Sequence, residues 1–463
     1  MTTDPRPTQA GTQTGMQTGP QTGMQTGMQT GPGGAAGGRL RVLLLADDCN
    51  PEWPSLPIVA FNYALELGAR AEITVATHVR NRAAIERARP GDARFVFLDN
   101  EWIAAPMHRL AARLRGGPEV AWSTSVMMRY LPYLAFERAA WQRFGPDLRR
   151  GRFDLVHRIS PMTPTLPSPL AGRTRTPFVL GPVNGNLDWP AAYRAEQTRE
   201  RERLRALRGL YKVLPHARRT QARAALVLAG FPHTMRDLDR VRPERLVNFP
   251  EIGVDPAVFH AAGRRPPFSG PGPARFLYAG RLVPYKLPEA AIRAMAGSAV
   301  LAPHRLDLVG DGPERARLEA LVAELGLGER VRFAGRRSQR EVAEAMRAAD
   351  ALVFPSIREL GAGVVVEAMA CGALCIVADY GAPGHLCGAG RGIALPLAPL
   401  DGMVRALRRA MEGCLADPED ARARAATGRA HAEAHYPWAR KAEHTIELYR
   451  AVLAGRPLPR PYD

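Results

Sequence analysis

Residues 355–372 read PSIRELGAGVVVEAMACG and place two glutamates, Glu359 and Glu367, eight positions apart. The apolar run Ala351–Phe354 before them predicts a buried strand, Glu359–Gly363 a turn, and the following valines the start of a helix. The free amides of a first helical turn and the positive end of the helix dipole favour a phosphate. Two carboxylates beside an anion site need hydroxyl donors as partners. The segment therefore predicts a ligand with both a phosphate and sugar hydroxyls.

The length and composition of the chain predict two domains behind a disordered tail. At 463 residues the chain is long for a single core, so two domains of ordinary size are expected. Residues 1–38 repeat Gln-Thr-Gly-Met and Gln-Thr-Gly-Pro, a composition that cannot bury enough apolar surface to fold. This tail has neither the basic start nor the apolar run of a signal peptide, and no later segment is long enough to cross a membrane. We therefore expect a cytoplasmic protein.

Basic residues outnumber acidic residues by 63 to 45, which gives a net charge of +18. Most arginines alternate with acids as on a solvated helix face, and no nucleic-acid-binding module is recognisable, so no nucleic-acid partner is expected. Residues 194–223 are the exception, because their arginines are interleaved with leucines at helical spacing. Two hypotheses fit this segment: a domain-packing helix with a charged outer face, which we favour, and a peripheral contact with an anionic membrane at its inner face.

The cysteines show no spacing typical of a metal site, although Cys371 and Cys375 are four positions apart. They fall at a predicted helix end and in a predicted strand, which favours buried reduced thiols over zinc ligands. No Asp-x-Asp or other metal-ligand cluster lies near the predicted ligand loops, so neither a metal nor another cofactor is expected.

Two series of apolar strands alternate with helices, and the Pro/Gly-rich segment 263–273 is a predicted linker between them. Continuous apolar strands separated by helices indicate parallel sheets covered on both faces. The predicted fold is α/β, with two Rossmann-like doubly wound domains facing a central cleft and ligands at the carboxyl ends of the strands. The first series of predicted strands is 41–46, 73–77, 95–98, 154–157, 177–180, 225–228 and 245–248. The second series is 276–279, 306–309, 331–333, 351–354, 374–377 and 392–395.

In the second series, glycines and cations follow successive strands. Gly280, Arg281 and Lys286 follow the first strand. Each cation alone would be an ordinary surface charge, but together at one strand end they are candidate diphosphate ligands, Arg281 through its planar fork and Lys286 as a point charge. The turn with Gly310 and Gly312 follows the second strand and is either a plain helix start or a ligand wall.

The third strand of this series is followed by Gly335 and Arg336. A flat nucleobase can lie against such a loop and take hydrogen bonds from its backbone. The nearby Ser338 and the later Ser356 are as well explained by helix capping and turn formation as by ligand binding.

These segments, in this order, resemble glycosyltransferase family 4, the retaining glycosyl transferases of group 1 with the GT-B fold. The resemblance rests on Gly-Arg-Leu with a following lysine, Val-Gly-Asp-Gly-Pro, Val-Arg-Phe-Ala-Gly, Pro-Ser, and the two glutamates with Glu-Ala-Met-Ala-Cys-Gly. It extends from about Arg245 to Tyr449 and includes IGVDPAVF at 252–259, similar to the segment that leads into the second domain of the family. One such motif is weak, whereas five in order are specific.

The resemblance implies a donor site for a nucleotide sugar in the second domain. Arg281 and Lys286 would hold the diphosphate and stabilise the leaving nucleotide, and Glu359 would contact hydroxyls of the donor sugar, which makes these three the candidate catalytic residues. Glu367 would accept hydrogen bonds from the ribose. Departure of a nucleoside diphosphate develops negative charge, which cations and helix-terminal amides stabilise without a metal. The implied donor-binding residues are Gly280, Gly310, Gly312, Gly335, Arg336, Gly361, Ala362, Gly363, Val364 and Glu367.

The first predicted domain departs further from the family pattern. Its first strand leads into the proline-rich loop 47–57, where relatives often carry a glycine-rich loop, and this segment either shapes an acceptor pocket or covers the sheet. In DLVHRISP at 154–161, Ile159 stands where the family carries a second histidine, while His157 remains and is at least as well explained by a structural role. The acceptor-side candidates are His157, Asn184 and Gly185.

The leading hypothesis is a glycosyltransferase that moves a hexose-type sugar from a nucleotide-diphosphate donor to a hydroxyl of a glycan or lipid-linked glycan, in polysaccharide or glycolipid synthesis. Retention of anomeric configuration is implied by the resemblance alone. A non-catalytic sugar-nucleotide-binding partner is the alternative motivated by Ile159 and by Ala362, which stands where relatives often carry glycine and is strained if that position needs a positive φ. A nucleotide-sugar epimerase or phosphorylase on the same fold is the second alternative.

The predicted parts are the tail 1–38, the acceptor-side domain 39–262, the nucleotide-sugar-binding domain 263–435, and a C-terminal helix 436–463 that packs back on the first domain.

Overall fold

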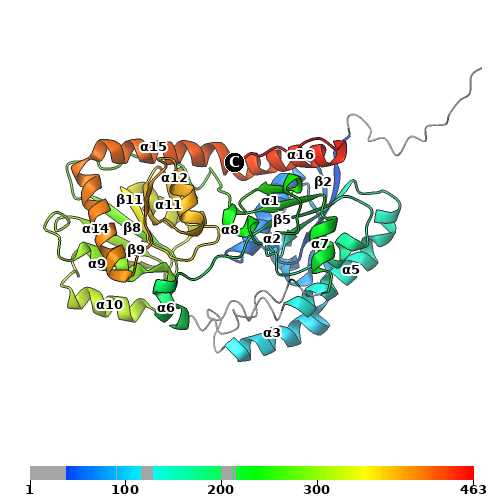
Figure 1. Ribbon diagram of the computed structural model, residues 1–463, viewed down its shortest axis with the longest axis horizontal. Coiled ribbons are helices and arrows are strands. Elements are labelled where there is room, and N and C mark those ends of the chain that lie inside the picture. The colour runs from blue at the N-terminus through cyan, green and yellow to red at the C-terminus, as the bar shows by residue number, and fades with distance from the viewer. Residues whose placement is uncertain (1–37, 90, 116–128, 200–211, 213–214, 463) are drawn as a thin grey trace, which may run out of the picture. The chain divides into compact units, whose positions relative to one another are not determined.

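The computed structural model describes residues 38–89, 91–115, 129–199, 212 and 215–462 (Figure 1). Arg39–Asp463 form one compact unit. Nearly all of the predicted tail lies outside the described residues, and so do residues 200–211 and 213–214 of the predicted basic helix. Where the chain is described, no helix is both long and apolar enough to span a membrane.

Two sheets, each entirely parallel, organise the described residues, and they confirm the prediction of two Rossmann-like domains. The first sheet has the order β3 (Arg94–Leu98), β2 (Glu72–His78), β1 (Arg41–Ala46), β4 (Leu155–Ser160), β5 (Phe178–Val183), β6 (Leu226–Ala229), β7 (Leu246–Asn248). The second sheet has the order β10 (Val331–Gly335), β9 (Arg305–Val309), β8 (Arg275–Ala279), β11 (Ala351–Phe354), β12 (Leu374–Ala378), β13 (Ile393–Leu395).

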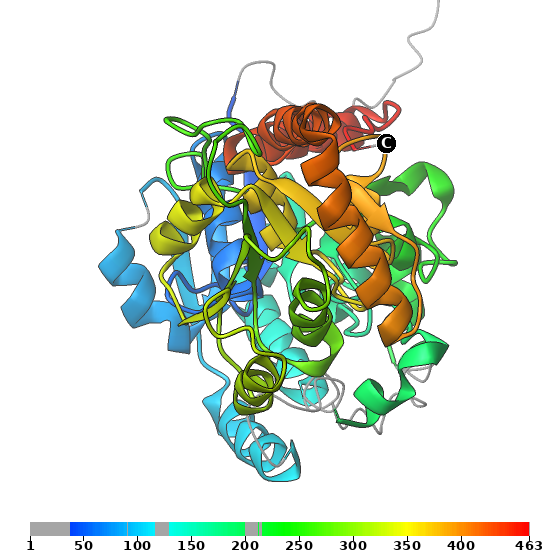
Figure 2. The same ribbon diagram turned by 90° about the vertical axis from the view of Figure 1, so that its left-hand side faces the viewer.

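Most residues of the central strands are apolar and buried, because helices cover both faces of each sheet. Every residue of β11 is inaccessible to solvent, and so are Val42–Ala46 of β1. Figure 2 shows the second domain from its end, with α14 in front of the strands of the second sheet, where α14 packs against α9. An alternating pattern with one polar face would have indicated an antiparallel sheet instead, so the continuous apolar runs were the informative signal.

The helices and short 3-10 turns between the strands are of ordinary length. Those of the first domain are α1 (Leu56–Gly68), η1 (Val79–Asn81), α2 (Arg82–Ala88), α3 (Glu101–Arg115), α5 (Tyr130–Arg149), η2 (Pro169–Gly172), η3 (Ala191–Tyr193), α6 (Arg194–Arg199), α7 (Ala217–Arg223), α8 (Phe231–Met235) and η5 (Pro243–Arg245). Those that follow are η6 (Pro284–Lys286), α9 (Pro288–Met295), α10 (Arg315–Glu324), α11 (Gln339–Ala348), α12 (Gly363–Ala370), α13 (Gly381–Cys387), α14 (Leu400–Ala416), α15 (Pro418–His435) and α16 (Trp438–Ala454).

Two connections between the sheets are hydrogen-bonded to each other. The backbone amide of Val254 donates to the carbonyl of Tyr436 at 2.9 Å, and the amide of Trp438 donates to the carbonyl of Val254 at 3.2 Å. Gly253 lies directly beneath the indole, since a Cβ added there would come within 2.7 Å of Trp438 Cδ2. Glycine is therefore required at this crossing for close packing rather than for a positive φ.

The C-terminal helix α16 packs on the core of the first domain, against α1 and beside β4. Its Tyr449 hydroxyl lies 2.5 Å from His157 Nδ1, and the other ring nitrogen, Nε2, lies 2.5 Å from the carbonyl oxygen of Gly181. Because a carbonyl can only accept, Nε2 carries the proton and Nδ1 accepts from Tyr449. Burial lowers the pKa of His157 to about 3, so the ring is neutral.

All five cysteines are free and buried, as expected for reduced thiols. Burial raises the pKa of Cys371 to about 11, which keeps this thiol protonated and unreactive.

We expect Tyr449→Phe to lower the free energy of unfolding by about 1–3 kcal/mol, because it leaves the buried Nδ1 of His157 without a donor. Urea unfolding followed by circular dichroism measures the change. Tyr130→Phe is the matched control: its hydroxyl is 3.5 Å from the carbonyl of Pro215 at the surface, and its loss should change stability by less than about 0.5 kcal/mol. Equal unfolding curves for Tyr449→Phe and the native chain would contradict the assignment.

Candidate functional site

Four neighbouring strands of the second sheet bring the predicted ligand loops together. The loops follow β8, β9, β10 and β11, and these four strands lie side by side in the order β10-β9-β8-β11. Because the strands are parallel, their carboxyl ends share one edge of the sheet. Segments separated by up to about 80 residues in the sequence thus converge on a single edge.

The glycines at this edge let backbones touch. Gly280 and Gly310 have φ values of 153° and 140°, which side chains rarely adopt, and a Cβ on Gly310 would lie 1.9 Å from the carbonyl oxygen of Gly280. A Cβ on Gly312 would lie 2.4 Å from the carbonyl oxygen of Leu282. The amide of Gly310 also donates to the carbonyl of Gly335 at 2.9 Å. In the structure these glycines allow the loops to pack closely against one another.

Lys286 and Glu359 form an ion pair across the ends of β8 and β11. Lys286 Nζ lies 2.5 Å from Glu359 Oε1, and Ser356 Oγ is 3.1 Å from the same oxygen. Burial lowers the pKa of Lys286, but the charge of Glu359, the neighbouring Tyr285 and the hydrogen bond to Glu359 together hold this pKa above its ordinary value. Lys286 Nζ also lies 4.9 Å from the centre of the Phe354 ring. The pair fixes a cation and a carboxylate side by side at the carboxyl ends of β8 and β11.

The two arginines at this edge are solvent-facing. Arg281 donates to the hydroxyl of Tyr285 at 2.9 Å, and its backbone carbonyl accepts from Tyr278. Arg336 is exposed at the end of β10, beside Gly335 with its φ of 71°. Both guanidiniums are thus accessible to an anionic ligand.

The helix α12 begins at Gly363, after a residue with left-handed geometry. Ala362, its N-cap, has φ 55° and ψ 48°, a conformation that costs about 1–2 kcal/mol for a residue with a Cβ. The amide of Val364 lies in the first helical turn, at the positive end of the dipole. The sequence analysis expected Ala362 to be strained if its φ is positive. Its φ is positive, so this strain is present in the loop.

Glu367 lies one turn into α12 and has no hydrogen-bond donor or cation within reach among the described side chains. Burial raises the pKa of this carboxyl to about 7. A carboxylate that is partly buried and unpartnered is suited to accept hydrogen bonds from a ligand hydroxyl. The role of Glu367 in ribose recognition stays a prediction.

Sequence reasoning missed Glu251, which follows β7. This carboxyl is 3% exposed, and its Oε1 accepts from the amide nitrogen of Asn184. A Cβ added to Gly361 would lie 2.0 Å from that same Oε1, so Glu251 is packed against the loop that leads into α12. Burial raises the pKa of Glu251. It lowers the pKa of Lys441 to about 7, and this lysine donates to the carbonyl of Pro250. A lone acid inside the apolar run LVNFPEIGV was the signal available in the sequence.

The three acceptor-side candidates are buried and tied to neighbours. Both ring nitrogens of His157 are hydrogen-bonded inside the core, to Tyr449 and to Gly181, so this side chain has a structural role. Asn184 is held by Glu251, and Gly185 exchanges two hydrogen bonds with Thr234, at 3.1 and 3.0 Å. Ile159, which stands in place of the family's second histidine, is fully buried in β4.

Two carboxylates at the end of β1 are a further feature of the first domain. Arg129 contacts both Asp48 and Asp47, the latter at 3.5 Å. Burial is the main cause, and the neighbouring Asp48 the second, that raises the pKa of Asp47 to about 7.

Trp189 is another residue that the sequence analysis did not single out. Its ring packs edge-on to Tyr285, with 6.3 Å between the ring centres, and lies 5.4 Å from the guanidinium of Arg358. These groups lie at strand ends and near the donor-side loop, where sequence periodicity gives no signal.

We expect Gly361→Ala to destabilise the chain by about 1–3 kcal/mol, because its Cβ overlaps the Glu251 carboxylate. Combined with Glu251→Ala, the loss should be smaller than the sum of the two single losses by at least about 0.5 kcal/mol. Gly328→Ala is the control, since a Cβ there meets no atom within 4 Å. Strict additivity in a double-mutant cycle of urea unfolding would show that the two residues do not press on each other.

Glu367 predicts a pH dependence of stability. Since its pKa rises from 4.5 to about 7 on folding, the folded chain binds this proton more tightly than the unfolded chain. The stability gained from that proton is present below pH 4.5 and is lost as the pH rises through 7. Glu367→Gln should therefore gain stability relative to the native chain over this range, whereas Glu344→Gln, on an exposed position of α11, should not. Parallel pH profiles of the native chain and Glu367→Gln would refute the burial of an unpartnered carboxyl.

Comparison with known proteins gives these observations a family context. Residues 263–430 match the family model described as glycosyl transferases group 1. The chain is 40% identical over 122 residues to the 2-deoxystreptamine glucosyltransferase of Streptomyces kanamyceticus, which covers 26% of this chain and 31% of that protein. It is 34% identical over 159 residues to the D-inositol 3-phosphate glycosyltransferase of Stackebrandtia nassauensis, which covers 31% of this chain and 36% of that protein. The chain thus spans about a third of the length of these curated relatives.

Solved structures match over most of the chain at low identity. The sucrose-phosphate synthase from Thermosynechococcus elongatus superposes with a TM-score of 0.63 at 21% identity, over 90% of this chain and 100% of that chain. HepE from Anabaena in complex with UDP superposes with a TM-score of 0.57 at 17% identity, over 89% and 100%. At such identities the likeness concerns the fold alone. The chain has the GT-B fold, and residues 263–430, which contain all four ligand loops, match the glycosyl transferases of group 1.

Proposed function

We propose that this chain is a retaining glycosyltransferase of family 4, which moves a sugar from a nucleoside diphosphate to a hydroxyl acceptor. The observation that carries the proposal is the arrangement of Lys286 and Glu359 at neighbouring strand ends, with the unpartnered Glu367 one turn inside α12. This arrangement offers a cation, a sugar-binding carboxylate and a ribose-binding carboxylate on one edge. The match of the same segment to the group 1 family supports it.

The proposed donor contacts follow from the charges. The diphosphate lies at the first turn of α12 and between Arg281 and Lys286, where amides and cations are both available. Glu367 accepts from the ribose hydroxyls, and the base lies against Gly335 and Arg336. UDP is the first nucleotide to test, because the HepE structure of the same fold was determined with it.

The transfer step breaks the bond between the anomeric carbon and the donor phosphate oxygen, and the electron pair leaves with the nucleoside diphosphate. The acceptor hydroxyl oxygen bonds to the anomeric carbon on the same face, and its proton passes to the departing phosphate oxygen. Arg281, Lys286 and the amides of α12 stabilise the charge that develops on this oxygen. Glu359 holds the sugar through its hydroxyls. The step as proposed needs no metal, since the cations and the helix supply the charge.

The acceptor is proposed as a glycan or lipid-linked glycan, with a cytoplasmic location and a peripheral membrane contact as further hypotheses. A second acceptor class is suggested by the names of the curated relatives, which act on 2-deoxystreptamine and inositol phosphate. Both are small polyhydroxylated rings. Asp47 and Asp48, which lie at the end of β1 with Arg129, would suit the recognition of hydroxyls of such a ring.

We expect Glu367→Ala to weaken the binding of the donor nucleotide by about 10- to 100-fold, as for the loss of a hydrogen bond to a charged group. Arg281→Ala should chiefly slow transfer, again by about 10- to 100-fold, because its charge matters most as the phosphate departs. Calorimetric titration with UDP, GDP and ADP measures the first effect, and mass analysis of products from a donor and acceptor panel measures the second.

Arg332→Ala is the matched control, because Arg332 is exposed in β10 away from its carboxyl end. Unchanged titration and turnover in both Glu367→Ala and Arg281→Ala would remove the site assignment. Tight nucleotide binding with neither transfer nor donor hydrolysis on any acceptor would favour a sugar-nucleotide-binding partner. A product isomerised without acceptor would favour an epimerase.

A further inference from the structure

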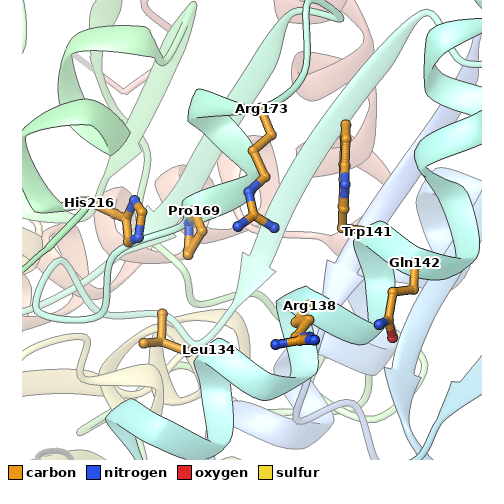
Figure 3. Close-up of a pocket in the computed structure, with 7 residues that line it drawn as sticks. All are labelled: Leu134, Arg138, Trp141, Gln142, Pro169, Arg173 and His216. Carbon is orange, nitrogen blue, oxygen red and sulfur yellow. The ribbon is translucent and has the colours of Figure 1, made fainter.

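A cavity of about 400 Å³ opens in the first domain and contains none of the donor-site residues (Figure 3). Its volume lies within the range of sites that hold small organic ligands. The lining residues are Leu134, Arg138, Trp141, Gln142, Pro169, Arg173 and His216.

One wall of the cavity is a single face of α5. Leu134, Arg138, Trp141 and Gln142 follow one another at spacings of four, three and one, which places them on one side of a helix. The opposite wall comes from η2 and from the residue before α7. Figure 3 shows the side chains of Arg138 and Arg173 with the Trp141 ring on one side and His216 on the other.

The walls are held in place by buried hydrogen bonds. Glu137, on α5, accepts from the backbone amide of Leu170 in η2 at 2.9 Å. Ser168, just before η2, donates its amide to Thr220 Oγ1 of α7 at 2.7 Å. All of these groups are buried, so α5, η2 and α7 form a fixed frame around the cavity.

The cations of the cavity lack acidic partners. Among the described residues, no carboxylate lies within ion-pair distance of Arg138 or Arg173, and His216 contributes a third basic group. The nearby acids are engaged elsewhere: Glu137 is turned into the core, and Asp147 pairs with Arg152 at 3.1 Å and with Arg143 at 4.0 Å. Two guanidiniums without a counter-charge on one cavity favour an anion.

The remaining lining distinguishes among anions. Trp141, Leu134 and Pro169 add an aromatic and apolar surface beside the cations. A guanidinium can donate two parallel hydrogen bonds to two oxygens of a phosphate. Two guanidiniums and an imidazole together offer more hydrogen-bond donors than the two oxygens of a carboxylate need, whereas a phosphate has a third oxygen for them. We propose that this cavity binds a phosphate monoester whose organic group packs against Trp141. The phosphate is supplied either by a soluble metabolite or by a lipid headgroup, which share this chemistry.

Phenyl phosphate is the probe, and isothermal titration calorimetry with the full chain is the measurement. We expect binding of phenyl phosphate but not of phenol, and a loss of affinity of at least about tenfold in Arg138→Gln/Arg173→Gln. Arg143→Gln is the matched control, since Arg143 is on the same helix but pairs with Asp147 and does not line the cavity. Arg138→Lys, which keeps the charge but loses the fork, should fall between the native chain and the double variant.

Phosphatidylcholine vesicles with and without phosphatidic acid distinguish the two sources. Co-sedimentation that requires phosphatidic acid and is lost in the double variant would identify the lipid headgroup, whereas phenyl phosphate binding without it would identify a soluble ester. Circular dichroism of each variant confirms folding, and titration with UDP checks that the donor site is intact. The proposal is overturned if phenyl phosphate does not bind at millimolar concentration, or binds equally to the native chain and the double variant.

Discussion

The parallel direction of all described strands is the constraint on which the candidate site depends. In a parallel sheet all carboxyl ends lie at one edge, so loops that are far apart in the sequence meet there without any contact encoded between them. Lys286 and Glu359 are 73 residues apart, and their ion pair exists because β8 and β11 are neighbours. The tight packing of Gly310 on Gly280 has the same origin, since two strand ends only 4.7–4.9 Å apart, by general sheet geometry, leave no room for a side chain between them.

Much of the fold was predictable because buried parallel strands have a distinct sequence pattern. Each strand from β8 to β13 was expected within one or two residues of its observed bounds, and Ala351–Phe354 matched β11 at both ends. The pattern works there because each run is wholly apolar and is bounded by glycine or by charge. Strand order was less accessible, since apolar runs do not specify which strand pairs with which. The fold class alone predicted that the four loops converge. The observed strand order β10-β9-β8-β11 explains why they do, because the four strands are neighbours.

Candidate site residues can be chosen from the sequence where they follow a predicted strand, but contacts that depend on long-range packing cannot. Arg281, Lys286 and Glu359 could be chosen from the sequence because each follows a strand. Glu251 stands out only as a lone acid in an apolar segment, and the sequence does not show its contact, because its partner Gly361 is more than one hundred residues away. His157 is the opposite case. Histidine in a strand is often a functional residue, but here both ring nitrogens are hydrogen-bonded to Gly181 and Tyr449.

The Lys286–Glu359 pair has a consequence for how a charged ligand would be recognised. A phosphate that approaches Lys286 meets an ammonium already neutralised by a carboxylate, so binding is an exchange of ionic partners and not the creation of a new ion pair. Part of the attraction is therefore offset by the release of Glu359, which must find hydroxyl donors in place of the ammonium. Such an exchange couples the two halves of the ligand: a phosphate without the sugar leaves Glu359 uncompensated, and a sugar without the phosphate leaves Lys286 unrelieved. If the proposed donor binds here, this single contact would favour the intact conjugate over either fragment.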